Sequence, residues 1–350
     1  MSSGFIDLFC GAGGAACGFM QAGAEPVLGV DNDAGALNCW AQNAPGATAR
    51  CAELFEGAEL PPARPGLHLH CSTPCQTLSR QRRSTADEAR VGLVAFRESL
   101  ALPLRRGDHT WSSEQVPHAR ALALVRAFER RFPERVAHAV VDAADYGTPS
   151  SRTRLVVGPP ALIQSLKERG RAGRVSMRAA FDAHRLSVPE GAVATTISRS
   201  RDGPQNRARR LDNVGFTVTA SHPMTWVDEG GASLGCLSWR HGAALMGFPT
   251  EWSFPHTSRA AQRAVGNAIP PPLAKAIMEA AMESHARVAM PAPIEQAALE
   301  AVRVPSDDDG PAHGGGVQKD KSAHTAILTQ LHKVEAELSA LKRMLSTGAT

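Results

Sequence analysis

The sequence lacks the features that mark secreted and membrane proteins. No stretch approaches the roughly 18 uninterrupted apolar residues of a membrane span, and no basic region precedes the first apolar run, residues 5–9. The seven cysteines are odd in number and follow no repeating frame, and none of their spacings fits a zinc site. These absences predict a reduced intracellular protein, cytoplasmic or nuclear, that needs no metal.

The sequence is also poor in lysine, because nearly all of its cations are arginine. Residues 152–210 hold twelve arginines and one lysine against four acidic side chains, although the net charge of the chain is only +4. Arginine makes bidentate contacts with phosphate and guanine. Coding bias in a GC-rich genome can also produce such a composition, but the clustering favours a nucleic-acid partner.

Short apolar runs alternate with helical patterns through the first half of the chain. Strands are predicted at residues 5–9, 26–30, 67–71 and 137–141, and one of the intervening helices at 120–131. A strand–helix–strand alternation of this kind predicts an α/β fold, with a Rossmann-like, doubly wound, mostly parallel sheet. A chain of 350 residues is long enough to bury a substantial core around it.

Changes of pattern divide the chain into five regions. Residues 1–160 are expected to form the main domain, 161–237 a small β-rich domain, and 238–290 the last part of the main domain. Residues 291–321 have the composition of a disordered linker. Apolar residues at spacings of four and three in 322–346 predict a C-terminal helix, either a coiled coil or a helix that folds back on the main domain.

The later regions contain recognisable segments of their own. In the small domain, residues 193–198 and 216–220 have strand-like patterns between polar, arginine-rich turns. In the region after it, residues 239–246 and 261–282 have helical patterns.

One cysteine lies where a reactive thiol would be expected. The segment Ser72-Thr73-Pro74-Cys75-Gln76 follows the alternating run 67–71, and proline stiffens the turn between them. Cys75 should therefore project at the carboxyl edge of the sheet, where open α/β sheets bind ligands. It is a candidate nucleophile, and the alternative is an inert buried cysteine.

A glycine cluster lies where the first strand turns into a helix. There the backbone N–H groups and the positive helix end face a ligand. Asp31 ends the next strand and is well placed to accept hydrogen bonds from ribose hydroxyls. Glycines alone indicate no more than a tight turn, but glycines followed by an acidic strand end favour a nucleoside-bearing cofactor.

Six further fragments, taken in order, resemble the cytosine-C5 DNA methyltransferase family across residues 5–282. The resemblance rests on these fragments: Asp7-Leu8-Phe9-Cys10-Gly11-Ala12-Gly13-Gly14, Pro74-Cys75-Gln76, Glu114-Gln115-Val116, Tyr146-Gly147-Thr148-Pro149-Ser150-Ser151-Arg152-Thr153-Arg154, Leu245-Met246-Gly247-Phe248-Pro249 and Gln262-Arg263-Ala264-Val265-Gly266-Asn267-Ala268-Ile269-Pro270. It implies transfer of a methyl group from S-adenosylmethionine to C5 of a cytosine flipped out of double-stranded DNA.

The resemblance also implies a role for each catalytic residue. Cys75 would add to C6 of the cytosine and form a covalent adduct. Glu114, protonated in a buried pocket, would hydrogen-bond and protonate N3. Arg154, with Arg152 nearby, would hold O2 of the base and favour the thiolate.

By the same comparison, the chain should contain a cofactor site and a DNA surface. The residues expected at the cofactor are Phe9, Cys10, Gly11, Gly13, Gly14, Asp31, Asn32, Glu53, Pro74, Leu93, Asn267 and Ala268. Those expected at the DNA are Gln76, Arg80, Arg82, Arg83, Arg199 and Arg201. Residues 161–237 would recognise the target, and because this region is short for the family, the recognised site should be short as well.

The chain departs from the family pattern at four places. Ser72-Thr73 replaces a glycine before the nucleophile loop, Gln115 replaces the asparagine that braces this loop, Ser150 replaces a glutamine, and His241 stands where glutamate is common. These changes leave two alternatives open. One is a transfer-RNA methyltransferase of the same fold, although its Cys-Phe-Thr signature is absent. The other is a catalytically weakened DNA-binding or scaffolding relative.

Overall fold

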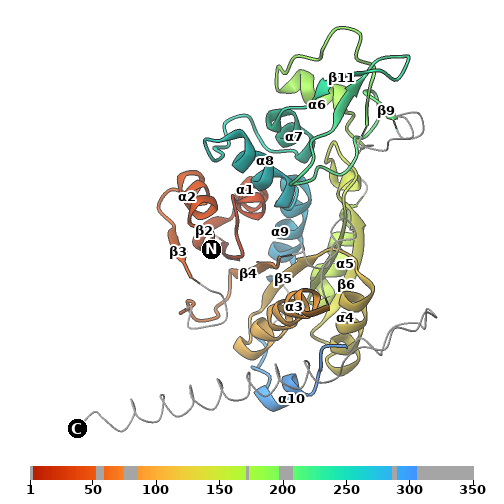
Figure 1. Ribbon diagram of the computed structural model, residues 1–350. Helices are drawn as coiled ribbons and strands as arrows, with labels where there is room; N and C mark the ends of the chain where they lie inside the picture. Colours follow the sequence, from red (N-terminus) through yellow and green to blue (C-terminus); the bar gives the residue numbers. More distant parts are fainter. Residues whose placement is uncertain are drawn as a thin grey trace, which may run out of the picture. The chain divides into compact units, whose positions relative to one another are not determined.

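The architecture is seen in a computed structural model, which describes residues 3–52, 59–74, 86–170, 173–196, 208–285 and 290–305 (Figure 1). Residues 1–307 form one compact unit. The predicted C-terminal helix at 322–346 lies outside the described residues.

A seven-stranded sheet forms the centre of this unit. Across the sheet, the strands lie in the order β3 (Thr48–Cys51), β2 (Glu25–Asp31), β1 (Gly4–Leu8), β4 (Leu67–Ser72), β5 (Thr110–Gln115), β7 (Thr153–Gly158) and β6 (Ala137–Asp142). The pairings from β3 to β5 are parallel, whereas β7 runs antiparallel between β5 and β6. The predicted α/β class with a mostly parallel, doubly wound sheet is confirmed.

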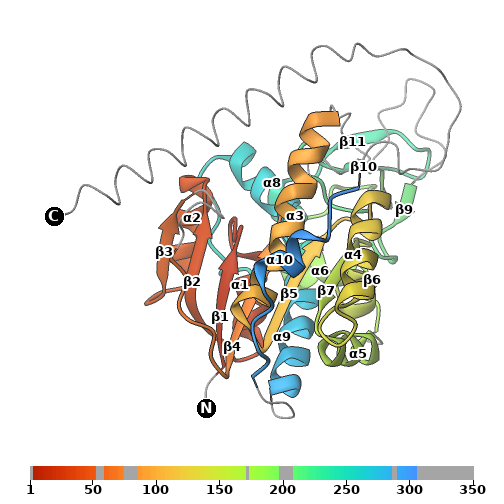
Figure 2. The ribbon, with the colours of Figure 1, turned by 90° about the horizontal axis from the view of Figure 1, so that it is seen from below.

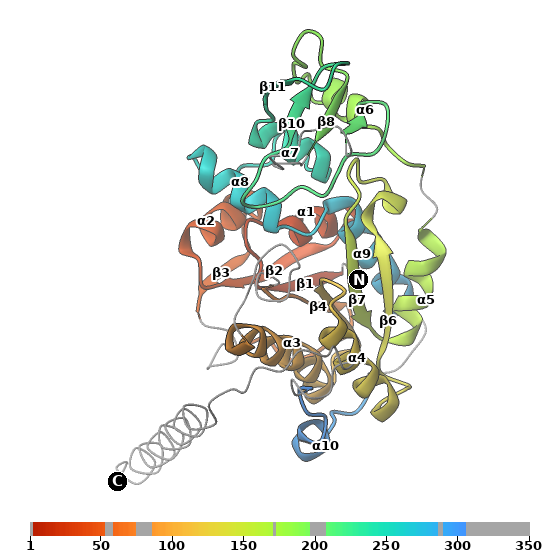
Figure 3. The ribbon, with the colours of Figure 1, turned by 45° about the vertical axis from the view of Figure 1, so that its right-hand side comes forward.

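Helices cover both faces of this sheet, which explains why its central strands are buried on both sides. One face is covered by α1 (Gly14–Gln21), α2 (Ala34–Asn43), α5 (Pro160–Arg169) and α9 (Pro271–His285), whose apolar side chains share a core with Phe5. The other is covered by α3 (Ala86–Arg106) and α4 (Ala119–Arg131), which pack on Ile6 and Leu8. Figure 3 shows the sheet between these two helix layers.

A second, smaller sheet forms the small β-rich domain. It is antiparallel, with the strand order β11 (Ser233–Cys236), β10 (Thr225–Val227), β8 (Ala194–Thr196) and β9 (Ala208–Arg210). Helices α6 (Met177–Ala183) and α7 (Trp239–Met246) share its core, which also contains Cys17 of α1 and Val265 of α8 (Ser258–Asn267). The small domain is therefore joined to the main domain by packing as well as by the chain.

Three details of the sequence-based organisation are wrong. Residues 161–169 belong to the main domain, because α5 packs Leu162, Ile163 and Leu166 into its core. Residues 216–220 form no strand. Thr217 Oγ1 donates to the Ser151 carbonyl oxygen, and the Val218 carbonyl oxygen accepts from Arg152 Nη1 instead of from a neighbouring strand. The helix expected at 261–282 is interrupted between α8 and α9.

The first part of the expected disordered linker is also ordered. Residues 290–305 contain α10 (Gln296–Glu300) and lie along α3 (Figure 2). Leu299 and Val302 are buried there, and Arg97 donates to both of their carbonyl oxygens, at 2.7 and 2.8 Å. We call residues 290–305 the strap. The strap also offers backbone carbonyl oxygens to Arg120 and Arg135.

In the described part of the chain, no helix is both long enough and apolar enough to cross a membrane.

Candidate active site

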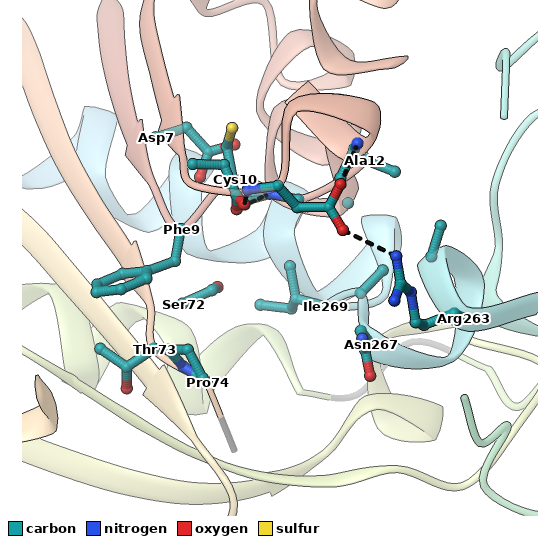
Figure 4. A pocket seen from close by; sticks show the side chains of 18 of the residues that line it. Asp7, Phe9, Cys10, Ala12, Ser72, Thr73, Pro74, Arg263, Asn267 and Ile269 are labelled. Atoms are coloured by element: carbon teal, nitrogen blue, oxygen red, sulfur yellow. Dashed lines mark hydrogen bonds and ion pairs between the residues drawn. The ribbon is translucent and has the colours of Figure 1, made fainter. Parts of the chain in front are cut away.

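A cavity of about 300 Å³ opens at the carboxyl edge of β1, β2, β4 and β5. Its walls are residues Asp7, Phe9–Ala12, Gly14, Ala15, Asp31–Asp33, Gly35, Ala36, Ser72–Pro74, Glu114, Arg154, Pro255, Ala260, Arg263, Ala264 and Asn267–Ile269. In Figure 4, Phe9, Thr73 and Pro74 lie on one side, and Arg263 and Asn267 on the other. Ligand pockets in proteins begin at about this volume.

The glycine turn after β1 shapes the wall nearest α1. Phe9 and Gly11 have left-handed backbones, with φ of 56° and 51°, and Gly11 has open space where a side chain would stand. A Cβ on Gly14 would come within 2.4 Å of the carbonyl oxygen of Ile269, so only glycine lets α1 begin this close to residues 267–269. Gly13 caps α1 but does not line the cavity, so its expected cofactor contact is not seen.

Asp31 presents its carboxylate at the end of β2, as predicted. Its two oxygens accept hydrogen bonds from the backbone N–H groups of Gly11 and Asp33, both at 2.8 Å. Burial nevertheless raises its pKa. Each oxygen keeps a second lone pair, which could accept from a ribose hydroxyl. Asp33, beside it, pairs with Arg263 of α8 at 2.9 Å.

Sequence reasoning missed Asp7 as a site residue, although it belongs to the first motif. Its carboxyl group is fully buried in the cavity wall, where Oδ2 accepts from Trp40 Nε1 at 3.1 Å. No hydrogen bond of ordinary geometry reaches Oδ1 from the described residues, although the Ala16 backbone N–H lies near enough to this carboxyl group to lower its pKa. Burial raises the pKa of Asp7 to about 7. A buried acceptor of this kind fits a ligand that carries a positive charge.

Glu114 and Arg154 form an ion pair in the same wall. Arg154 Nε lies 2.5 Å from Glu114 Oε1, and both side chains are at least nine-tenths buried. The pairing follows from the sheet, because Glu114 faces Val156 in register and Arg154 lies two residues along the same face of β7. A carboxyl group and a guanidinium group therefore meet beside Pro74, as the two motifs predicted.

Arg152 serves the structure rather than the cavity. Its guanidinium donates to the carbonyl oxygens of Val218, Gly266 and Ala268 at 2.9–3.0 Å, and it is not part of the cavity wall. It ties the strand bearing Arg154 to the small domain and to α8. The expected catalytic role of Arg152 at the base is therefore replaced by a supporting one.

Gln115 braces the nucleophile loop in spite of its extra methylene. Its amide Nε2 donates to Thr73 Oγ1 at 3.0 Å and to the Thr73 carbonyl at 3.3 Å, while its Oε1 accepts from the Val116 N–H at 2.8 Å. The side chain is fully buried. Thr73, another departure from the family pattern, supplies one of these acceptors. The two departures therefore complement each other.

Replacing Gln115 by alanine is expected to destabilise the protein by about 1–3 kcal/mol and to slow the methyl transfer that the sequence resemblance implies about tenfold, because the backbone before Cys75 loses its brace. Thermal unfolding and steady-state kinetics measure the two effects. Thr73→Val removes only the side-chain part of the brace, so its effects should be smaller. A Gln115→Ala protein that transfers methyl groups at the unaltered rate would show that the brace has no functional role.

The other two departures stabilise the fold. Ser150 Oγ donates to the Leu245 carbonyl at 2.7 Å. His241 lies edge-on to Phe181 and Trp226 in the small-domain core, with Nε2 at 3.1 Å from the Ser187 carbonyl oxygen. Burial lowers the pKa of His241. Neither residue is part of the cavity wall.

The structure separates the remaining expected residues into three groups. Cys10, Asn32, Pro74, Asn267 and Ala268 line the cavity. Leu93 does not, because it faces the sheet from α3 and is fully buried in the core. The residues outside the described parts of the chain are Glu53, Cys75, Gln76, Arg80, Arg82, Arg83, Arg199 and Arg201.

The sheet order and the cavity at its carboxyl edge define a Rossmann-like α/β protein with a site for a nucleoside-sized ligand. The sequence profile of the C-5 cytosine-specific DNA methylase family matches residues 3–97 and 192–283. The chain belongs to this family, whose members use S-adenosylmethionine.

Two bacterial relatives, both from Herpetosiphon aurantiacus, are similar in sequence. The type II methyltransferase M.HgiDI is 26% identical over 294 residues, which cover 77% of this chain and 91% of that one. The type II methylase M.HgiDII is 27% identical over 168 residues, or 45% of this chain and 47% of that one.

Solved structures share the fold. A putative DNA modification methyltransferase encoded within a prophage of E. coli superposes with a TM-score of 0.56 at 18% identity, covering 81% of this chain and 99% of that one. The S. pombe Dnmt2 methyltransferase gives the same TM-score and coverage at 16% identity.

Proposed function

We propose that the protein transfers a methyl group from S-adenosylmethionine to C5 of a cytosine in duplex DNA. The observation that carries the proposal is the Glu114–Arg154 pair in the wall of the cavity. The pair lies beside Pro74, and Pro74 is followed in the sequence by Cys75. An acid, a cation and a thiol are the groups that activation of C5 requires, because cytosine becomes nucleophilic there only after addition at C6.

The cavity has features that fit S-adenosylmethionine. Asp31 can accept from the ribose hydroxyls and the Phe9 ring can pack on the adenine, while the glycine turn leaves room for the methionine part. Asp7 Oδ1, a buried acceptor in the wall, suits a ligand with an ammonium and a sulfonium group. Bound there, the cofactor supplies an electrophilic methyl group.

In the proposed mechanism, each catalytic residue acts on a different part of the base. The Cys75 thiolate forms a bond to C6, and Glu114 gives a proton to N3 as the ring accepts electrons. Arg154 holds O2 and stabilises the negative charge that develops on the ring. Once C5 carries the methyl group that a bound cofactor would supply, with S-adenosylhomocysteine as the leaving group, a water molecule takes the C5 proton. The Cys75–C6 bond then breaks to regenerate the thiolate, and N3 returns its proton to Glu114.

The pH dependence of cofactor binding should depend on Asp7. A bound cation favours the ionised carboxylate, so affinity for S-adenosylmethionine should fall as the pH drops below about 7, by up to about tenfold per pH unit. Asp7→Asn should bind more weakly at pH 8 but with little pH dependence between pH 5.5 and 8. Calorimetric titration measures both. If the affinity of the two proteins for S-adenosylmethionine changed with pH in the same way, Asp7 would be excluded as the titrating group.

The same shift has a consequence for stability. Because folding raises the pKa of Asp7, the native state holds its proton more tightly, and the free energy of unfolding should fall as pH rises from 3.8 to about 7. In Asp7→Asn this contribution should be absent. The free energy of unfolding is measured against pH for both proteins. The difference between the two profiles isolates the contribution of Asp7 from those of other titrating groups.

The substrate is tested by offering duplex DNA and transfer RNA side by side with a labelled methyl donor. Methylation of DNA alone, mapped by bisulfite sequencing to cytosines in a short consensus, is the expected result. Methylation of transfer RNA alone would replace DNA by RNA as the substrate. Covalent trapping on 5-fluorocytosine DNA would separate an active enzyme from a scaffolding relative, which would form no adduct.

A further inference from the structure

A chain of five polar side chains, four of them buried, runs between the two central strands β4 and β5. It passes from Thr110 through His68, Ser112 and His70 to Ser72, and we call these five residues the histidine ladder. His68 Nδ1 lies 3.2 Å from Thr110 Oγ1, and His68 Nε2 lies 2.9 Å from Ser112 Oγ. His70 Nδ1 lies 2.7 Å from the same Ser112 Oγ, and His70 Nε2 lies 2.8 Å from Ser72 Oγ.

Both histidines are buried among apolar groups. Their side chains are fully buried, and the Phe19 ring stands edge-on to both, with centroids 5.6 and 5.1 Å away. Burial lowers the pKa of His70 to about 3. A neutral imidazole has one N–H donor and one acceptor nitrogen.

This chemistry gives the ladder a direction. The hydroxyl of Ser112 lies between two imidazoles but has only one proton, so at least one of the two facing ring nitrogens must donate to it. When Ser112 donates to His68, a neutral His70 must carry its proton on Nδ1 and accept from Ser72 at Nε2. The tautomer of His70 sets the direction of the bond at Ser72. If His70 Nε2 donates to Ser72, the Ser72 proton can form a hydrogen bond with another group. If His70 Nε2 accepts from Ser72, that proton is already used in the bond to His70.

The ladder ends at the cavity described above. Ser72 is half-buried and forms part of the cavity wall, together with Thr73 and with Phe9, the residue after β1. In the strand register Ser72 faces Glu114, as His70 faces Ser112, and on the other side Asp7 of β1 faces His70. Thr110, at the far side of the ladder from Ser72, is fully buried. The ladder therefore connects fully buried side chains to the cavity wall.

We propose that the histidine ladder is a positioning device that sets the direction of the Ser72 hydroxyl toward the ligand in the cavity. The ligand class is the S-adenosyl cofactor of the proposed function, on which the inference rests, because Ser72 lies among the residues assigned to that cofactor. An apolar pair of strands would fill this space at lower desolvation cost. Within a low-dielectric core, a satisfied polar chain holds its last member in one orientation.

Two neighbouring serines of β5 provide a matched test. Ser112 belongs to the ladder, whereas Ser113 points to the opposite face and bonds Ser99 Oγ at 2.7 Å, and both are buried. Ser72→Ala and Ser112→Ala are each expected to weaken binding of S-adenosylhomocysteine about fivefold by calorimetry, whereas Ser113→Ala should leave affinity within about twofold. The double variant Ser72→Ala/Ser112→Ala should bind no more weakly than Ser72→Ala alone, and Ser112→Thr should restore affinity.

Histidine NMR provides a test that needs no variant. With ¹⁵N-labelled histidine, His68 and His70 should each show one neutral tautomer when S-adenosylhomocysteine is bound, and their resonances should move on binding. Any of three results would overturn the proposal. The first is an equal loss of affinity in Ser112→Ala and Ser113→Ala, the second is an additive loss in the double variant, and the third is histidine resonances that do not move on binding. If the unaltered protein bound no S-adenosylhomocysteine at all, the proposed function itself would fail.

Discussion

Replacing Cys75 by alanine is expected to abolish methyl transfer, with a fall of at least about a thousandfold, while affinity for S-adenosylhomocysteine stays within about twofold. The loss should be this large because no other group can form the bond to C6 without which C5 does not react. Cofactor affinity should be retained because the substitution leaves the described residues of the cavity wall, Pro74 included, unchanged. Transfer of labelled methyl groups and calorimetry measure the two quantities.

A second thiol provides the control for this experiment. Cys236 is exposed on β11, away from the cavity, and Cys236→Ala should retain full activity. The Cys75→Ala protein should also fail to form an adduct with 5-fluorocytosine DNA, whereas the Cys236→Ala protein should form one. An active Cys75→Ala protein would contradict the covalent mechanism and point to a different nucleophile.

Replacing Glu114 by glutamine is expected to lower the turnover rate by about a hundredfold to a thousandfold, the range of a lost general acid. Glutamine fits the same space and can still hydrogen-bond N3, but it cannot supply a proton. Binding of DNA and cofactor should therefore change little, and the loss should appear in turnover rather than in KM. Single-turnover kinetics on a duplex with one target site separates these quantities.

The control removes a carboxylate from an Arg–Glu pair outside the cavity. Glu279 of α9 pairs with Arg169 of α5 at 2.8 Å, both side chains are partly exposed, and neither residue lines the cavity. Glu279→Gln removes one carboxylate from an Arg–Glu pair, as Glu114→Gln does, yet turnover should be unchanged. If both variants lost activity equally, general destabilisation would explain the result and the catalytic role of Glu114 would be rejected.

The sequence was most informative where local pattern and burial agree. The helix expected at residues 239–246 matches α7, and the strand expected at 67–71 is β4 with one residue more. Strand β5 escaped notice because its sequence, Thr-Trp-Ser-Ser-Glu-Gln, is mostly polar, although all six residues are buried. Its polar side chains are satisfied by His68, His70 and Thr73, partners that no local pattern reveals.

The site residues divide along similar lines. Asp31, Glu114 and Arg154 all line the cavity, because each lies at a strand end and these ends meet at one edge of the sheet. Their roles stay predictions. Motif order could not separate Arg154 from Arg152, since the direction of each guanidinium depends on partners in the small domain. Leu93 was misplaced because only the packing of α3 decides which of its apolar residues face the core.

The strap shows that the folded unit extends past the family match. The family profile ends at residue 283, yet Leu299 and Val302 complete the core beside α3. A shortened protein that stopped at the end of the match would lose the carbonyl partners of Arg97 and uncover the outer surface of α3. The chain after Cys75 leads into helix α3, so the C-terminal boundary of a shortened protein would decide how much of the packing of α3 is retained. A protein that keeps the strap must extend to residue 305 rather than stop at 283.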